Sequence, residues 1–145
     1  MESIDQLPEG HKVAEEVAIE DLRQFLKLRK RKSMDAEELL ETYPDIVEAI
    51  QLGLLTLPED GAPTYILRDP IKGDSGEIST SQIIFKTRIT PSEQRKVANG
   101  VDLKKDQLLF AHKCLAFVVG QPLAMLDKFE EGDYKVIDQL ATVFI

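Results

Sequence analysis

Residue types that provide cross-links, metal ligands or membrane anchoring are scarce in this chain of 145 residues. It has one cysteine, two histidines and no tryptophan. The lone Cys114 cannot form a disulfide within the chain, which is typical of a reducing compartment. The longest relevant apolar run, CLAFVVG at 114–120, is far shorter than the ~18 residues that a membrane-spanning helix needs. The acidic start MESIDQLPEG lacks the layout of a secretion signal, so we expect a cytoplasmic protein without a membrane span.

The residues that could act as catalysts or metal ligands are poorly arranged for either role. His112 and Cys114 are the only close pair of soft ligands, and residues two apart on a helix point to different faces. His112 lies among apolar neighbours, as a core or boundary histidine does. The acid pairs at 37–38 and 130–131 are typical of a solvated helix face. We therefore expect no metal site, no cofactor and no catalytic residue, and a protein that is not an enzyme.

Acidic residues outnumber basic ones by 26 to 18, and the net charge is −8. This charge disfavours nucleic acid as a partner, because affinity for phosphates comes largely from Lys and Arg. The basic stretch KLRKRK at 27–32 is an exception. It could bind an anion or an acidic partner, or it could be the end of a helix, where cations interact favourably with the helix dipole. We favour the second interpretation.

The first third of the chain predicts three helices. Apolar residues at helical spacing indicate a first helix that ends at the basic stretch; they are Ile19, Leu22, Phe25 and Leu26. Asp35 followed by Glu38 has the spacing of a capping box and predicts a second, short helix. Pro44 interrupts that helix, and Thr42 is positioned to cap a third helix, DIVEAIQL, which ends at Gly53.

The second and third helices could be read as a DNA-binding helix-turn-helix, or as an adaptor. The third helix contains Asp45 and Glu48 and no Lys or Arg, so it would repel a phosphate backbone. A small helical cluster that packs on the rest of the protein is the favoured interpretation.

The hydrophobic period changes after residue 53. The segments LLTLPEDGAPTYIL and ISTSQIIFKTRI predict strands, and KGDSGE between them predicts a hairpin turn. In the second strand, four residues alternate on one face: Ile83, Phe85, Thr87 and Ile89. Lys86 and Arg88 fall on the other face.

Helices return after residue 90. Thr90, Pro91 and Glu93 form a strong start signal, and Asn99–Gly100 a stop. A longer apolar helix should follow and end at Gly120, with Leu108, Ala111, Leu115 and Val118 on its core face. A brief turn of helix at PLAMLDKF should be broken by Gly132, and Asp133 should cap a final helix whose core face carries Ile137, Leu140, Ala141 and Phe144.

These elements predict an α+β fold. It comprises a helical N-terminal region at 1–57 and, at 58–145, a β-hairpin or small antiparallel sheet with a C-terminal helical cluster. The candidate partner-binding residues are large apolar side chains around the corner before the final helix: Leu123, Met125, Leu126, Phe129 and Tyr134. The alternative is that they close the core beneath that corner.

Residues 64–145 resemble the tail assembly chaperones of Mu-like and P2-like contractile-tailed phages. The order of the motifs carries the resemblance: the hairpin, the helix entry RITPSEQRK, the apolar helix DQLLFAHKCLAFVVG and a closing pattern. That pattern falls on Gly120, Pro122, Leu123, Leu126, Phe129, Asp133, Tyr134, Ile137, Val143 and Phe144. The resemblance does not extend to residues 1–57, for which we match no counterpart in the family.

The resemblance implies a protein of the host cell cytoplasm that binds the tape measure protein and recruits tail tube or other tail proteins. It would cover apolar stripes of its client and be displaced as the tube polymerises. A homo-oligomer is compatible with this role. One alternative is a baseplate or neck component retained in a phage or phage-like particle.

Overall fold

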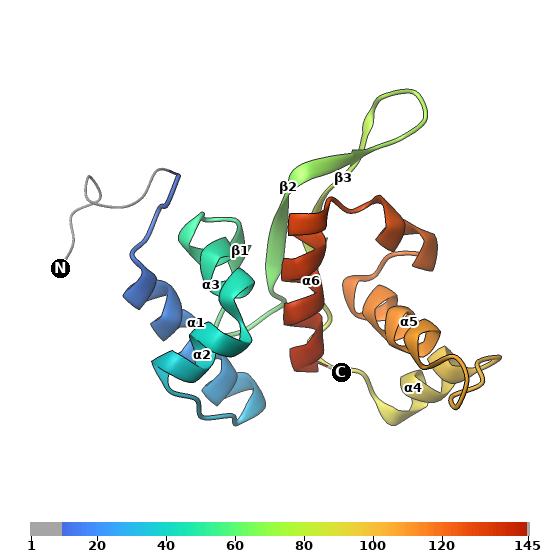
Figure 1. The fold of residues 1–145 in the computed structure, drawn as a ribbon, viewed down its shortest axis with the longest axis horizontal. Coiled ribbons are helices and arrows are strands. Elements are labelled where there is room, and N and C mark those ends of the chain that lie inside the picture. The colour runs from blue at the N-terminus through green and yellow to red at the C-terminus, as the bar shows by residue number, and fades with distance from the viewer. Residues whose placement is uncertain (1–9, 145) are drawn as a thin grey trace.

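Three helices form the N-terminal region of the computed structural model, which describes residues 10–144. They are α1 (Glu15–Lys30), α2 (Ala36–Thr42) and α3 (Pro44–Gln51), and they pack together as one cluster (Figure 1). The apolar stripe predicted for α1 is confirmed, because Ile19, Leu22, Phe25 and Leu26 are all buried.

The corner between α2 and α3 differs from the prediction in how its helix ends are capped. Asp35 caps α2 as expected and accepts a hydrogen bond of 2.9 Å from the Glu38 amide. Thr42, however, is the last residue of α2, and Pro44 begins α3 at the first helical position, which suits its fixed φ angle. The free amides of Asp45 and Ile46 donate to Oε1 of Gln139, at 3.1 and 3.3 Å. A side chain 94 positions away thus replaces the local cap.

A three-stranded antiparallel sheet follows, in the order β1 (Leu55–Thr56), β2 (Thr64–Lys72) and β3 (Ile78–Ile84). The predicted hairpin is confirmed. The predicted end of the second strand is wrong, because β3 ends at Ile84 and not at Ile89. The Lys86 amide donates to the carbonyl of Val118 at 2.8 Å, which takes the chain off the sheet. Phe85 and Ile89 are nevertheless buried, as the alternation required.

The distal part of the hairpin projects from the body of the molecule (Figure 1). Its turn is closed by the Gly73 amide, which donates to the carbonyl of Glu77 at 2.7 Å, and Gly76 adopts a φ of 84°, which favours glycine. The register between β2 and β3 is regular near the body and shifts beyond Ile66. Residues 72–79, at the tip of the hairpin, are all exposed.

Four helical segments complete the chain: α4 (Pro91–Ala98), α5 (Gln107–Val119), the 3₁₀ helix η2 (Leu123–Lys128) and α6 (Glu131–Phe144). The start signal of α4 is confirmed as a capping box between Thr90 and Glu93. Gly120 ends α5 in the left-handed conformation, with a φ of 66°, as predicted. The capping role expected for Asp133 is wrong: α6 begins two residues earlier, and the Glu130 carboxylate accepts from the amides of Gly132 and Asp133, at 2.8 and 3.3 Å.

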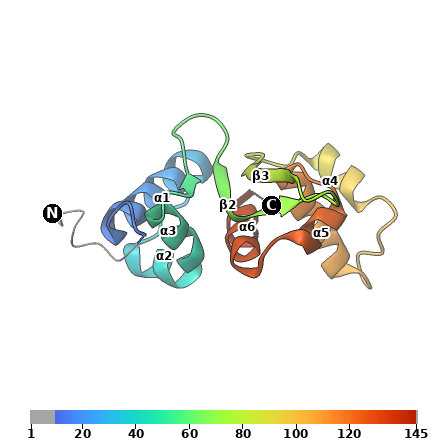
Figure 2. The same cartoon turned by 90° about the horizontal axis from the view of Figure 1, so that it is seen from above.

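Helix α6 lies at the centre of the molecule. It packs against α3, α5 and β2, so it separates the N-terminal helices from α4 and α5, which lie at opposite ends (Figure 2). The Phe25 and Phe144 rings meet edge to face, with centroids 6.0 Å apart. Buried residues from both sides of residue 57 form one core, and β1 pairs with β2 across that boundary. The α+β class is confirmed.

Candidate functional site

Exposed leucines gather where α4 connects to α5. Leu103, Leu108 and Leu109 lie within seven positions of the chain, and their exposed fractions are 50%, 70% and 37%. We call these three residues the leucine surface. Exposed apolar side chains so close together in the chain make this connection a candidate site for contact with another molecule.

The position of Leu103 follows from a local turn. The Asp102 carboxylate accepts from the amides of Lys104 and Lys105, at 3.0 and 3.3 Å, and the Asp106 amide donates to the Asp102 carbonyl at 2.7 Å. This tight turn leads directly into α5 and leaves the leucine inside it facing solvent. The same segment carries four charged residues beside Leu103 in the sequence: Asp102, Lys104, Lys105 and Asp106.

Helix α5 is buried in its second half only. Cys114, Leu115 and Val118 lie in the core, whereas Leu108 and Ala111, predicted to share the core face, are exposed. Helix α4, which packs beside α5, has no fully buried residue within Pro91–Ala98. The hydrophobic period therefore predicted the helix correctly, but Leu108, Leu109 and Ala111 in its first turns are exposed within the described part of the chain.

The candidate partner-binding residues of the corner are divided between core and surface. Leu126 and Phe129 are buried, with exposed fractions of 6% and 9%, so they close the core beneath η2. Met125 and Tyr134 are partly buried and pack against that core. Leu123 alone is exposed, at 37%. The five residues do not form one open surface; Leu123 is the member still free to contact a partner.

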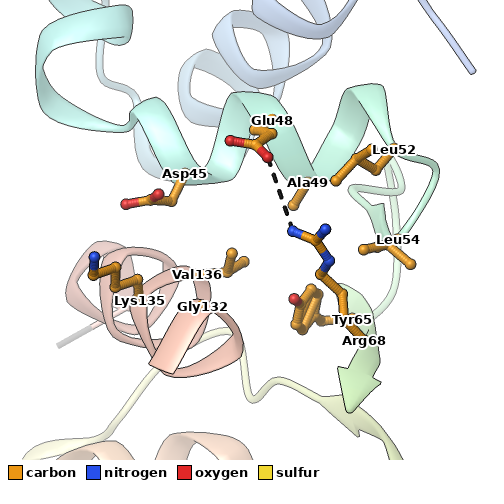
Figure 3. A pocket seen from close by; sticks show the side chains of 10 residues that line it. All are labelled: Asp45, Glu48, Ala49, Leu52, Leu54, Tyr65, Arg68, Gly132, Lys135 and Val136. Carbon is orange, nitrogen blue, oxygen red and sulfur yellow. Dashed lines mark ion pairs between the residues drawn. The ribbon is translucent and has the colours of Figure 1, made fainter. Parts of the chain in front are cut away.

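A pocket of about 180 Å³ lies between α3, β2 and α6 (Figure 3). Its apolar floor includes Ala49, Leu54 and Val136. At its mouth, Arg68 reaches toward Glu48, with their charged atoms 3.9 Å apart, and both side chains are more than half exposed. An exposed pair of this kind contributes little to stability. The pocket lies between the N-terminal helices and the C-terminal half. It is smaller than the ~300–1,000 Å³ of ordinary small-molecule sites.

Beneath this pocket lies a buried carboxylate, Asp133, which has no exposed surface. It accepts hydrogen bonds from the Tyr65 hydroxyl at 2.5 Å and from the amides of Arg68 and Asp69, each at 3.0 Å. Burial and the bond to Asp133 raise the pKa of Tyr65 above its usual range, so its hydroxyl remains protonated and cannot serve as a base. The network fixes α6 on β2. The sequence marks Asp133 only as a helix-start residue.

The two residues with reactive side chains near the C-terminal core are not arranged for catalysis. Cys114 is buried, and burial raises the pKa of its thiol, which opposes formation of a nucleophilic thiolate. His112 is partly buried on the same helix. Among residues 10–144, no three His, Cys, Asp or Glu side chains are grouped closely enough to hold a metal ion.

The basic stretch at 27–32 largely contacts the protein itself. Arg29 donates to the carbonyls of Pro58 and Glu59, at 3.2 and 3.4 Å, and lies over the Phe25 ring. Lys30 lies over the Phe144 ring and Lys32 over the Tyr43 ring, at 5.5 and 5.9 Å. Helix α1 ends at Lys30, with Lys27, Arg29 and Lys30 in its last turn, so the stretch lies at a helix end, as the favoured interpretation predicted.

Helix α3 is enclosed by its neighbours. Ile46, Val47, Ala49, Ile50 and Gln51 are all buried, because α1 and α2 cover one side and α6 the other. Its exposed positions include Pro44 and the acid Glu48, and the helix carries no lysine or arginine.

Comparisons with models of protein families, with curated proteins and with solved structures give no match for this chain. None of the helices between residues 10 and 144 is both long enough and apolar enough to cross a lipid bilayer.

Proposed function

We propose that this protein is a phage tail assembly chaperone, which binds the tape measure protein and recruits tail subunits through apolar contacts. The observation that carries the proposal is the leucine surface, which has no covering element within the described part of the chain. It lies within residues 64–145, the part whose sequence resembles the chaperones of Mu-like and P2-like phages. Leu123 supplies a further exposed contact in the same half.

The leucine surface suits a helical client. Burying one fully exposed leucine contributes about 1.5–3 kcal/mol, whereas association costs about 4–15 kcal/mol in lost freedom. The three side chains by themselves would therefore support a weak, reversible contact, with further contacts needed around them. Such a contact is non-directional, and polymerising tube subunits could therefore displace the protein by covering the same stripe of the client. The net charge of −8 would keep the complex with an aggregation-prone client soluble.

The direct test is co-expression with the product of each neighbouring gene, followed by capture of the tagged chain. Recovery of a long helical tape measure protein supports the proposal, and its absence from every capture contradicts it. Mass spectrometry of purified mature particles then separates a chaperone, which should be absent, from a baseplate or neck component, which should be present.

A pair of matched variants locates the contact. Leu108→Glu should weaken capture of the client at least about tenfold, because a charge cannot be buried against an apolar stripe. Leu28→Glu is the control, since Leu28 is also an exposed helical leucine, at 60%, but lies on α1 at the opposite end. Equal losses in both variants would show that the leucine surface is not the binding site.

A further inference from the structure

Charge is distributed unevenly along this acidic chain. Residues 86–113, which we call the basic segment, contain seven lysines and arginines but three acids, a net charge of +4. The remaining residues contain 11 lysines and arginines and 23 acids, a net charge of −12. The basic segment includes α4 and the first half of α5, which lie at the opposite end of the molecule from α1, α2 and α3 (Figure 2). The leucine surface lies within this basic segment.

The positive charge of the basic segment is poorly neutralised by its own acids. Two of the three acids are bound by the backbone: Glu93 accepts from Thr90 in the capping box of α4, and Asp102 accepts from two amides of the turn that follows it. Of the seven cations, Lys86 alone forms an ion pair among the described residues, with Glu93 at 3.9 Å. Five of the other cations are exposed: Arg88, Arg95, Lys96, Lys104 and Lys105.

Several of these cations lie close to the leucine surface. The lysines at 104 and 105 directly follow Leu103 in the tight turn that leads into α5. Lys113 follows Leu109 by four positions on α5, which places the two side chains on one face of the helix. Helix α4 carries two further exposed cations and packs on α5. Packed helices have axes ~8–10 Å apart, about one Debye length at physiological salt, so these charges also act on a molecule bound at the leucines.

We infer that the leucine surface binds an amphipathic helix of its partner in which Asp and Glu border the apolar stripe. This inference rests on the proposed function, which takes the three leucines as the contact with a client, and it adds the charge of that client. The apolar stripe covers the leucines, while the carboxylates beside it meet the lysines. Apolar burial supplies the affinity of such a contact, and complementary charge accelerates association and selects the partner.

Two other anionic partners, a lipid bilayer and a nucleic acid, fit the surface less well. Asp102 and Asp106 lie in the same turn as Leu103, so insertion of this leucine among lipid headgroups would bring two carboxylates toward phosphates. Nucleic-acid affinity comes largely from contacts between phosphates and Lys or Arg, and exposed leucines add nothing to these contacts. A protein helix can place a cation or a hydrogen-bond donor opposite the two acids.

Three matched peptides test the charge of the partner against the full chain. The first is a helical peptide of about three heptads with leucines along one stripe and glutamates beside it. The second has lysines in place of the glutamates, and the third has alanines in place of the leucines. In fluorescence anisotropy, we expect the chain to bind the first peptide with a Kd below about 1 mM and at least about tenfold more tightly than either of the others. Raising NaCl from about 50 to about 500 mM should weaken this binding.

A reversal of charge on the protein keeps the test independent of folding defects. The double variant Lys104→Glu, Lys105→Glu should bind the glutamate peptide at least about tenfold more weakly than the native chain, and the lysine peptide more tightly. A misfolded variant would not gain the second affinity. The control is the double variant Lys27→Glu, Lys72→Glu, because both lysines are exposed and lie outside the basic segment. It changes the net charge equally and should leave both affinities within about twofold.

Several results would overturn the inference. They include equal binding of the glutamate and lysine peptides, and no binding of either up to about 1 mM. Binding to vesicles of phosphatidylserine and phosphatidylcholine under conditions in which the glutamate peptide does not bind would assign the surface to a bilayer. Self-association of the native chain that the Lys104 and Lys105 reversal abolishes would assign it to the acidic helices of a second copy.

This inference and the proposed function can fail separately. Capture of a tape measure protein that the Lys104 and Lys105 reversal does not weaken would support the proposed function and contradict the acidic partner. A preference for the glutamate peptide, without capture of any tail protein, would support the acidic partner and contradict the proposed function.

Discussion

The N-terminal helices and the first turns of α5 both contain leucines at helical spacing, with opposite outcomes. Leu22 and Leu26 of α1 have no exposed surface, whereas Leu108 at the start of α5 is 70% exposed. Helices α1, α2 and α3 pack on one another, and α3 also packs on α6. Helices α4 and α5 lie at the opposite end of the molecule (Figure 2). Hydrophobic spacing thus identifies a helix face, but a neighbouring element must be present to bury it.

The two regions should differ most in the free energy of unfolding that is lost when a leucine of each is replaced by alanine. We expect Leu22→Ala to lower the free energy of unfolding by about 2–5 kcal/mol, because it leaves a cavity in the core. Leu108→Ala should change it by less than about 0.5 kcal/mol. Denaturant titration of both variants measures the contrast. A cost above about 1 kcal/mol for the Leu108 variant would show that the leucine surface is covered in solution.

An intermediate effect is expected where α6 meets β2. Asp133→Ala should lower the free energy of unfolding by about 2–3 kcal/mol, because three donors lose their acceptor and one of them, the Tyr65 hydroxyl, is buried. Thermal and denaturant unfolding measure the loss.

Tyr65→Phe is the matched control for this network. It removes the hydroxyl and leaves the two backbone bonds to Asp133, so its cost should be about 1 kcal/mol. A Phe variant as costly as the Ala variant would show that the tyrosine bond, rather than the backbone bonds, holds α6 on the sheet.

The smallest effect concerns the capping box of α4 and depends on pH. Hydrogen bonds from the Thr90 amide and hydroxyl lower the pKa of Glu93 below its ordinary value of 4.5. The stabilisation is therefore complete above the ordinary pKa and is lost as the pH falls through the lowered value. Amide exchange within α4 should increase over that range.

Glu93→Gln separates the charge from the cap. Glutamine can accept the same bonds at a capping-box position but does not titrate, so exchange in α4 should become independent of acid pH. If α1 showed the same acid response as α4 in the native chain, the effect would be global unfolding rather than loss of this cap.

The parts of the fold that could be predicted are those set by neighbouring residues. The apolar stripe of α1, the start of α4 at Thr90, the end of α5 at Gly120 and the hairpin turn all follow from spacing, capping or glycine conformation. The cap of α3 could not be predicted, because its acceptor Gln139 is distant in sequence. The division of the five corner residues could not be predicted either, because it depends on which side of η2 faces the core. Leu126 lies on the buried side of η2, and Leu123 is exposed.

By itself the sequence determined the helices, the hairpin and the scarcity of reactive side chains, because each depends on residues within a turn or two of one another. Tertiary packing alone decided that Asp133 is an acceptor for β2, that Leu108 and Leu109 of α5 are exposed, and that β3 is an edge strand of the sheet formed by the described residues. Burial depends on which elements meet in space, and in this chain α6 reaches α3, α5 and β2 but leaves the start of α5 in water.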